Sequence, residues 1–504
     1  MIRDTLIVTS LSLGASILGF LSQLLFARTF GASVGMDVYF TILSIPTIFT
    51  GLAPVAFTGV LVPYLINFKH NTDERENFVK VVFIYIIFFS LSFILIGIIS
   101  GIIITSRHLH KLNMPFDSVI ISLIILIWLS SGMSLVNSFF ASIHNSKNLF
   151  SRVAVGSLFP PLIIVLSVLL LGHDMGVMSV AFGYFLGTVA QMALLFVKII
   201  PRNGLSGIII KLNSQQILLF KKFIPVIISL IPFTVVGSIS YYWASFLPIG
   251  SISLIAYSQS FAGILSVASG LGVATVSLPF IASGIINEVE DKSVEYISQY
   301  LKYILILSIF GATIIYGIKT EMIELLYEHG SFSESSSSVF SGLLVWYLIG
   351  AVFAACLNLI RNYFYSRDEN VVLAKISIFI PPLFILISGI LSNYYSVNGI
   401  GMAYAITNVI FLFILIMYVK NDNAKLLSKE LVLFFLNIVL MALIVSFAAS
   451  KLRILFLTSI PILGILIIQV AVIMSLFIGL SIKVFKVKEI IIVYKLIIKY
   501  LKLA

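Results

Sequence analysis

Charged residues are scarce in this sequence: they make up 10% of its 504 residues, whereas soluble domains carry about a quarter. Hydrophobic residues reach 60% of the chain. A chain with so few polar side chains could not cover its folded surface in water, so we expect lipid to be its solvent. The composition therefore argues against a soluble enzyme or binding protein and predicts an all-α polytopic membrane protein.

The sequence lacks the residues that disulfide bonding, zinc binding and ATP binding usually require. The single cysteine, Cys356, excludes an internal disulfide, and six histidines are scattered without the spacing of a zinc site. No Gly-Lys-Ser/Thr loop is present to cradle a nucleotide phosphate, so ATP is not expected as the direct energy source. We expect no cofactor, and we expect any active transport to be coupled to the membrane potential or to a cation gradient.

The beginning of the chain has no pattern of a cleavable signal peptide. Its first four residues, Met1 to Asp4, lead directly into an apolar stretch that is too long for a signal h-region. No small-residue cleavage site follows this stretch. We therefore expect an uncleaved first membrane span.

Apolar runs long enough to cross a bilayer recur along the whole sequence. A helix needs about 20 predominantly apolar residues to span the hydrocarbon core. About 14 runs meet this requirement, at 5–27, 37–66, 79–105, 119–141, 150–172, 174–200, 218–246, 251–286, 294–317, 337–363, 371–393, 398–419, 428–449 and 458–483. No connection between them is long enough for a separate soluble domain.

The positive charges are distributed unevenly between the two sides of these predicted spans. With a cytoplasmic N-terminus, 25 of the 31 lysines and arginines fall on the inner side and 6 on the outer side. Cytoplasmic loops of membrane proteins carry such an excess. The sequence thus predicts a multi-pass protein of the bacterial cytoplasmic (inner) membrane with both termini in the cytoplasm, and it explains the net charge of +11 without nucleic acid.

The two halves of the sequence resemble each other. The first half contains Phe140-Ala141-Ser142 followed by Pro160-Pro161, and the second contains Phe364-Tyr365-Ser366 followed by Pro381-Pro382. This repeat predicts two pseudo-symmetric six-helix lobes plus two C-terminal helices, with domains at 1–215, 216–424 and 425–504. An even number of helices in each lobe makes the repeats parallel, as in transporters with a central cavity. Prolines within spans, such as Pro46 and Pro54, are typical of helices that bend beside a cavity.

Three stretches of the sequence contain a distinctive order of residues: Leu18-Gly19-Phe20 with Ala27-Arg28, Phe30-Gly31-Ala32, Asp37, Pro46 and Val62-Pro63; Ala244-Ser245-Phe246 with Gly250-Ser251, Ser253, Tyr257 and Leu278-Pro279; and Leu326-Tyr327 with Gly330, Phe332, Tyr347, Gly350 and Phe364-Tyr365-Ser366-Arg367. They resemble the MurJ (MviN-type) lipid II flippase family of the multidrug/oligosaccharidyl-lipid/polysaccharide exporter superfamily. The stretches occur in the family's order and extend over both predicted lobes.

This resemblance implies two six-helix lobes in a V, with two further helices that form a groove for a lipid tail. It also implies a flippase, not an enzyme, that carries an undecaprenyl-diphosphate-linked sugar from the inner to the outer leaflet by alternating access. The implied partners are this polyprenyl-diphosphate-linked glycan, membrane lipids and envelope-synthesis proteins, with no role for nucleic acid.

The sequence departs from the family at the arginines that hold the diphosphate. The two positions on the first helix are Ser16 and Ser22, the position on the second helix falls near Thr50 and Gly51, and the position on the eighth helix is Ser260. These replacements leave open whether the headgroup is lipid II or that of another lipid-linked glycan, such as a capsule or teichoic-type precursor.

Polar and ionisable residues within the spans are the candidates for a substrate cavity, because an intramembrane polar group usually serves a function. We expect Arg28 and Asp37 to pair across the first turn, and Ser16 and Gln23 to share one helix stripe. The candidate residues are Ser16, Ser22, Gln23, Arg28, Asp37, Tyr242, Gln259, Ser260 and Arg361. Helix packing through small polar residues is the alternative explanation for many of them.

Other functions remain as alternatives to a flippase. A cation-coupled exporter of drugs or metabolites would share the superfamily fold but usually needs a buried acidic residue in a lobe. A transport-inactive scaffold for envelope synthesis is a second alternative, because the cavity arginines are missing. An enzyme acting on the same lipid is disfavoured, because the longest external loop, near 318–336, offers few groups for catalysis.

Overall fold

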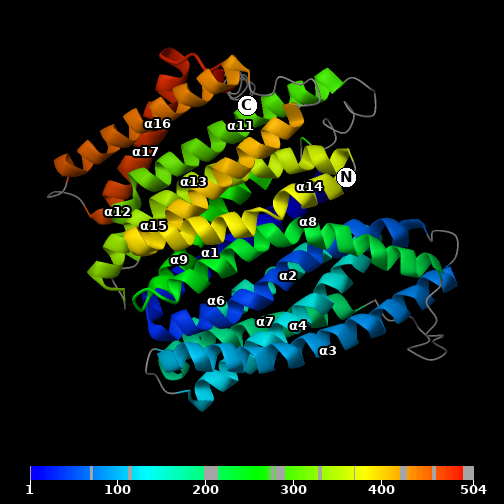
Figure 1. The fold of residues 1–504 in the computed structure, drawn as a ribbon. Helices are drawn as coiled ribbons and strands as arrows, with labels where there is room; N and C mark the ends of the chain where they lie inside the picture. The colour runs from blue at the N-terminus through cyan, green and yellow to red at the C-terminus, as the bar shows by residue number, and fades with distance from the viewer. Residues whose placement is uncertain are drawn as a thin grey trace. The chain divides into compact units, whose positions relative to one another are not determined.

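The computed structural model describes residues 2–67, 72–111, 116–197, 214–271, 273, 277, 290–326, 332–367, 369–420, 428–456 and 461–491. Within these ranges the chain is an all-α membrane protein (Figure 1). Its helices are α1 (Ile2–Phe30), α2 (Val34–Asn67), α3 (Thr72–Lys111), α4 (Ser118–Ser146), α5 (Phe150–Gly156), α6 (Phe159–Met175), α7 (Met178–Phe196), α8 (Ser214–Ala244), α9 (Ser251–Ser266), η1 (Val267–Leu271), α11 (Glu290–Gly317), α12 (Lys319–Leu326), α13 (Glu334–Ser366), α14 (Asn370–Ser377), α15 (Ile380–Lys420), α16 (Lys429–Phe456) and α17 (Ile462–Lys483).

Thirteen helical segments in this part of the chain are long and apolar enough to cross a membrane. One of them, Val371–Val419, has 49 residues, which at 1.5 Å per residue is far longer than one crossing requires. It breaks at Ser396, whose φ of 53° and ψ of −134° are not helical. A Cβ on Gly399 would lie 2.1 Å from the carbonyl oxygen of Leu391, so the backbones on either side of the break approach closely. Counting this segment as two crossings agrees with the predicted number of about 14.

The prolines of α2 do not break it. The helix continues through Pro46, Pro54 and Pro63 for 34 residues. Some expectations lie outside the described residues, among them the end of the predicted eighth span, at 286, the Leu278-Pro279 motif, and Tyr327 and Gly330 of the third family-like stretch.

The chain divides into two compact units. The first comprises Met1–Tyr257 and Ser377–Pro382, and the second comprises Ser258–Ile376 and Leu383–Ala504. The boundary between them falls within α9. The predicted domain limits at 215 and 424 remain predictions, and the second of these lies outside the described residues.

In the first unit, α4 packs against α2, α3 and α7 (Figure 1). Close approach of α3 and α4 depends on glycine, because a Cβ on Gly97 would lie 1.9 Å from the Trp128 ring. The Ser90 hydroxyl also donates a 2.8 Å hydrogen bond to the carbonyl of Gly132 across this contact. Small residues commonly allow membrane helices to approach in this way.

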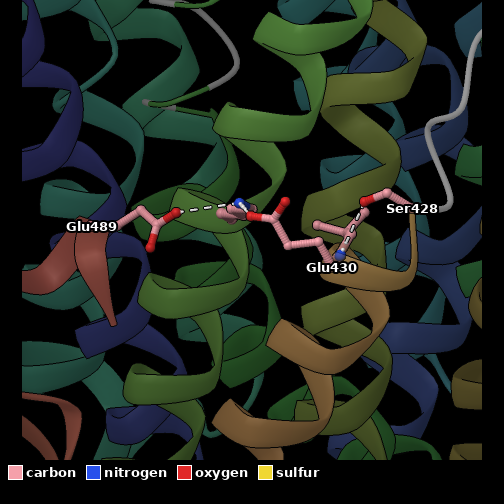
Figure 2. Close-up of polar contacts among 5 residues, drawn as sticks. Ser428, Glu430 and Glu489 are labelled. Carbon is pink, nitrogen blue, oxygen red and sulfur yellow. Dashed lines mark hydrogen bonds and ion pairs between the residues drawn. The ribbon is translucent and has the colours of Figure 1, made fainter. Parts of the chain in front are cut away.

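In the second unit, α11 packs against α13, α16 and α17. At the beginning of α16, Ser428 caps the helix by accepting a 3.1 Å bond from the backbone N–H of Leu431. The Lys302 ammonium of α11 lies 2.9 Å from the carboxylate of Glu430 and 3.5 Å from that of Glu489 (Figure 2). These ion pairs join α11 to α16 and to the segment that follows α17.

Candidate functional site

The turn between α1 and α2 is built from a glycine and a capping serine. Gly31 ends α1 with a φ of 65°, a conformation that glycine adopts without steric cost, and its N–H donates to the carbonyl of Ala27 at 2.9 Å. Ser33 then accepts a 3.4 Å bond at its side-chain oxygen from the N–H of Met36. The turn therefore begins α2 at a fixed position and places Asp37 in its first turn.

The carboxylate of Asp37 binds the beginning of α9. It accepts hydrogen bonds from the backbone N–H groups of Gly250 at 2.6 Å and Ser253 at 2.8 Å, and from the hydroxyl of Ser253. Asp37 is buried, and these three donors satisfy its charge. The N–H groups belong to the N-terminal end of a helix, where the backbone dipole also favours an anion.

Two further contacts join the same turns. The fully buried hydroxyl of Tyr257 donates a 2.9 Å bond to the carbonyl of Gly31. Gly250 has a φ of 91°, and a Cβ there would lie 2.7 Å from the carbonyl oxygen of Ala32. We refer to Gly31, Asp37, Gly250, Ser253 and Tyr257 as the α2–α9 junction. Its members hold two turns, distant in sequence, in direct contact.

The α2–α9 junction differs from the expected pairing of Asp37 with Arg28. Arg28 is exposed, and among the described residues no ion pair joins it to Asp37. The backbone donors of α9 replace the guanidinium as partners of the carboxylate. The expectation of an Arg28–Asp37 pair was therefore wrong, although Asp37 does fix the first turn of α2.

The other first-unit candidates have varied surroundings. Ser16 and Ser22 donate hydrogen bonds within α1, to the carbonyls of Ser12 at 3.0 Å and Gly19 at 2.6 Å. The side-chain oxygen of Gln23 is buried without a hydrogen-bond partner, which makes it available to a ligand donor. Tyr242 has 59% of its surface exposed and packs edge-on against Phe246, at 5.2 Å between ring centres.

The remaining candidates belong to the second unit. The side-chain amide of Gln259 donates a 3.4 Å bond to the hydroxyl of Tyr347, whose ring stacks on that of Tyr404 at 4.9 Å. Ser260 and Arg361 are partly buried, and both take part in polar or electrostatic interactions. The roles of all these residues in substrate binding remain predictions.

Of the junction residues, only Asp37 is a candidate from sequence; Gly31, Gly250, Ser253 and Tyr257 occur only in the stretches that carry the family resemblance. The available signal was the order Gly250-Ser251 followed by Ser253, which is typical of a helix N-terminus that can bind an anion. A buried Asp37 in another span is the matching anion. Among the described residues, no group of three metal-ligating side chains is placed to hold a metal ion.

The comparison with protein families gives one match over most of the chain. The family model described as lipid II flippase MurJ matches residues 26–478. A probable lipid II flippase MurJ from Buchnera aphidicola subsp. Baizongia pistaciae is 27% identical over 421 residues, which cover 79% of each chain. The corresponding protein of Buchnera aphidicola subsp. Acyrthosiphon pisum is 24% identical over 457 residues, which cover 88% of each chain.

Solved structures show the same fold. A lipid II flippase MurJ in an inward closed conformation matches with a TM-score of 0.74 at 19% identity and covers 95% of this chain and 100% of its own. An inward-facing multidrug resistance transporter of the MATE family and the MOP superfamily matches with a TM-score of 0.59 at 11% identity. That match covers 84% of this chain and 95% of the transporter.

Proposed function

Since the chain belongs to the lipid II flippase MurJ family, we propose that it moves an undecaprenyl-diphosphate-linked sugar precursor from the inner to the outer leaflet of the bacterial cytoplasmic membrane. The match of the family model to residues 26–478 is the observation that carries this proposal. Peptidoglycan synthesis would consume the product. The substrate, membrane lipids and proteins of envelope synthesis would be its partners.

The α2–α9 junction supports a conformational role in this transport. Alternating access needs contacts that form in one state and break in another. Asp37 joins α2 to the beginning of α9 through three short hydrogen bonds, all of them within the first unit. We assign these bonds to the state in which the ends of α2 and α9 are closed on each other.

Replacement of Asp37 by asparagine tests this role. Asparagine keeps one acceptor oxygen, but it loses the charge and adds donors that face the N–H groups of Gly250 and Ser253. We expect at least a tenfold lower rate of flipping in proteoliposomes, because the closed state loses charge-assisted hydrogen bonds. Asp117→Asn is the matched control, since Asp117 is an exposed cap of α4. Equal rates for D37N and the unchanged protein would remove the junction from the mechanism.

Both termini are assigned to the cytoplasm by the charge distribution. Cysteines introduced at Ser335 and Glu76, both exposed, test this topology with an impermeant maleimide on intact spheroplasts. Labelling at position 335 and protection at position 76 are expected. The native Cys356 is buried and should contribute little background.

A related glycan on the same carrier lipid is the second candidate substrate. Ser16, Ser22 and Ser260 occupy positions where the resemblance implies diphosphate-binding arginines, which favours a headgroup bound through hydrogen bonds. Depletion of the protein in its host decides between the two: accumulation of lipid II with lysis identifies a peptidoglycan flippase, and accumulation of another lipid-linked glycan with an intact wall identifies the second function. A cell that accumulates neither lipid would contradict both.

The identity of the residues that bind the headgroup is part of this proposal, and so is the energy source of transport. Gln23 and Gln259 are the candidates to test first, because the buried side-chain oxygen of Gln23 lacks a hydrogen-bond partner and the amide of Gln259 donates a 3.4 Å bond to the hydroxyl of Tyr347. Leucine at each position should raise the substrate concentration needed for half-maximal transport. A collapse of the membrane potential or of a cation gradient in the same assay tests the coupling.

A further inference from the structure

An apolar groove lies within the second unit between α11, α13 and α16. Its volume is about 690 Å³, and its walls include Leu348, Val352, Phe353, Phe435 and Leu443. The groove extends along α16 from Phe435 to Ser450, about four turns of the helix. α17 contributes no residue to its walls among those described. A groove of this length and lining is suited to a hydrocarbon chain that lies parallel to the helices.

One end of the groove carries two lysines. The ammonium of Lys319 lies 4.7 Å from the centre of the Tyr316 ring, and the ammonium of Lys451 lies 5.6 Å from the centre of the Phe447 ring. Tyr316 and Phe447 are both groove-lining residues. Each lysine therefore lies over an aromatic wall of the groove, within the range of a cation–π contact.

The two lysines belong to the same end of the groove because their helices touch beside them. A Cβ on Gly317, the last residue of α11, would lie 3.5 Å from the Cβ of Ala449. Lys319 follows Gly317 by two residues, and Lys451 follows Ala449 by two residues. The charge distribution assigns this end of α11 and α16 to the outer side of the membrane.

Neither lysine is neutralised within the described part of the chain. The ion pairs found there involve His173, Lys302 and Arg367, but not Lys319 or Lys451. The nearest acidic residue along α12, Glu321, is buried and accepts a 2.9 Å bond from Gln469. Burial lowers the pKa of Lys319, so its charged form lacks compensation that an anion would supply.

A groove in the first unit provides an internal comparison. It has a volume of about 610 Å³ and is lined by α2, α3, α4 and α8, with walls that include Phe49, Phe57, Phe88 and Phe223. Among the described residues, no lysine or arginine lies over any of its aromatic rings. An apolar groove of similar size thus occurs in this chain without a lysine or arginine over its rings among the described residues.

From the apolar groove and its cationic mouth, we propose that the second unit binds one anionic phospholipid of the outer leaflet, with an acyl chain in the groove and its phosphate between Lys319 and Lys451. The lipid is a resident ligand and not the transported substrate. Its chemistry follows from the site: hydrocarbon walls select a chain, and two unpaired ammonium groups select a headgroup with net negative charge. A zwitterionic headgroup carries its own positive group, which would lie close to the ammonium groups of Lys319 and Lys451 and be repelled by them.

The proposal predicts a preference that is measured on the unchanged protein. Delipidated protein in detergent is titrated with phosphatidylglycerol or phosphatidylcholine, and the lipids that remain bound are counted by native mass spectrometry. One phosphatidylglycerol should bind more tightly than any phosphatidylcholine. A lysine near a charged lipid surface contributes about 1 kcal/mol, which is about fivefold in affinity, so the K319Q/K451Q variant should bind phosphatidylglycerol about 25-fold more weakly.

Two matched controls separate the contribution of the lysine charges to lipid binding from the contribution of the apolar groove. Lys429→Gln removes a lysine from the other end of α16 and should leave phosphatidylglycerol binding unchanged. Leu443→Trp fills the groove and should weaken binding of both lipids, whereas Leu440→Trp, at an exposed position of α16 outside the groove, should not.

Three results would overturn the proposal. The first is equal binding of phosphatidylglycerol and phosphatidylcholine to the unchanged protein. This measurement does not depend on the folding of any variant. The second is unchanged phosphatidylglycerol binding in the folded K319Q/K451Q variant. The third is displacement of phosphatidylglycerol by an equimolar amount of undecaprenyl phosphate, which would reassign the groove to the transported lipid.

Discussion

Two sets of helix contacts, one in each unit, are made by different means. In the first, α3 lies against α4 because Gly97 leaves room for the ring of Trp128. In the second, α11 and α12 are joined to α16 and α17 by polar side chains: Lys302 pairs with Glu430, and Gln469 donates to Glu321, each at 2.9 Å. In lipid, burial of apolar surface hardly distinguishes a neighbouring helix from an acyl chain. Close packing and hydrogen bonding therefore have to provide the specificity.

The two kinds of contact respond to opposite changes. A contact based on glycine fails when atoms are added, since the space is already filled by the neighbouring ring. A contact based on buried polar groups fails when atoms are removed, since the partner loses a donor or acceptor that water cannot replace. Substitutions in the two units can therefore test the comparison, and the expected effects differ in size.

Gly97→Val should have the largest effect. A Cβ at this position would lie 1.9 Å from the Trp128 ring, and Trp128 is 3% exposed and has little room to move. Overpacking of this kind should lower the free energy of unfolding by about 3 kcal/mol. Thermal unfolding in detergent, followed by tryptophan fluorescence or calorimetry, measures the change.

The neighbouring ring and a second glycine provide the controls for this substitution. Gly59 in α2 has no atom within 4 Å of its ideal Cβ, so Gly59→Val should change stability far less. The double variant Gly97→Val with Trp128→Leu should recover part of the loss, because the smaller side chain restores space. A loss of the same size at Gly59 would show that glycine in α3 has no special packing role.

Gln469→Leu should have an intermediate effect on the second unit. Leucine removes a donor from the buried carboxylate of Glu321, and a hydrogen bond to a charged buried group contributes about 2 kcal/mol. The midpoint of thermal unfolding should fall accordingly. Ser475→Ala, at an exposed position of α17, is the matched control and should have little effect. If Gln469→Leu left the midpoint unchanged, the polar contact would not be what joins α12 to α17.

Glu430→Gln should have the smallest effect. The Glu430 side chain is 79% exposed, and Lys302 keeps a second partner in Glu489, whose side chain is 15% exposed. Exposed ion pairs rarely contribute measurably to stability. No change in the unfolding midpoint is expected at low or high salt. A clear loss that disappears in high salt would show that this pair is stronger than its exposure suggests.

The membrane spans could be predicted from sequence because the length of each apolar run decides whether a helix can cross the bilayer. This rule separated 371–393 from 398–419, and the structure breaks at Ser396 between them. The helix α2 continues through three prolines without ending at any of them, and bending at these prolines stays a prediction. A long helix in lipid retains its remaining backbone bonds, because no water is present to compete for them.

The partners of Asp37 could not be predicted in the same way. Gly250 and Ser253 lie more than 200 residues away in sequence. Hydropathy fixes which segments cross the membrane but not how far each is displaced along its axis, and this displacement decides which side chains meet. Arg28, the nearest charge in sequence, was therefore chosen in error. The cationic mouth at Lys319 and Lys451 was undetected for the same reason, because it needs the ends of α11 and α16 to align.

The break at Ser396 has a consequence for biosynthesis. The two apolar helices on its sides are joined without a charged loop: the segment from Asn393 to Asn398 contains only Asn, Tyr, Ser and Val. The ribosome therefore delivers both helices in succession, with no charged segment between them to hold them apart at the membrane surface. We expect the pair to leave the translocon as one preformed unit.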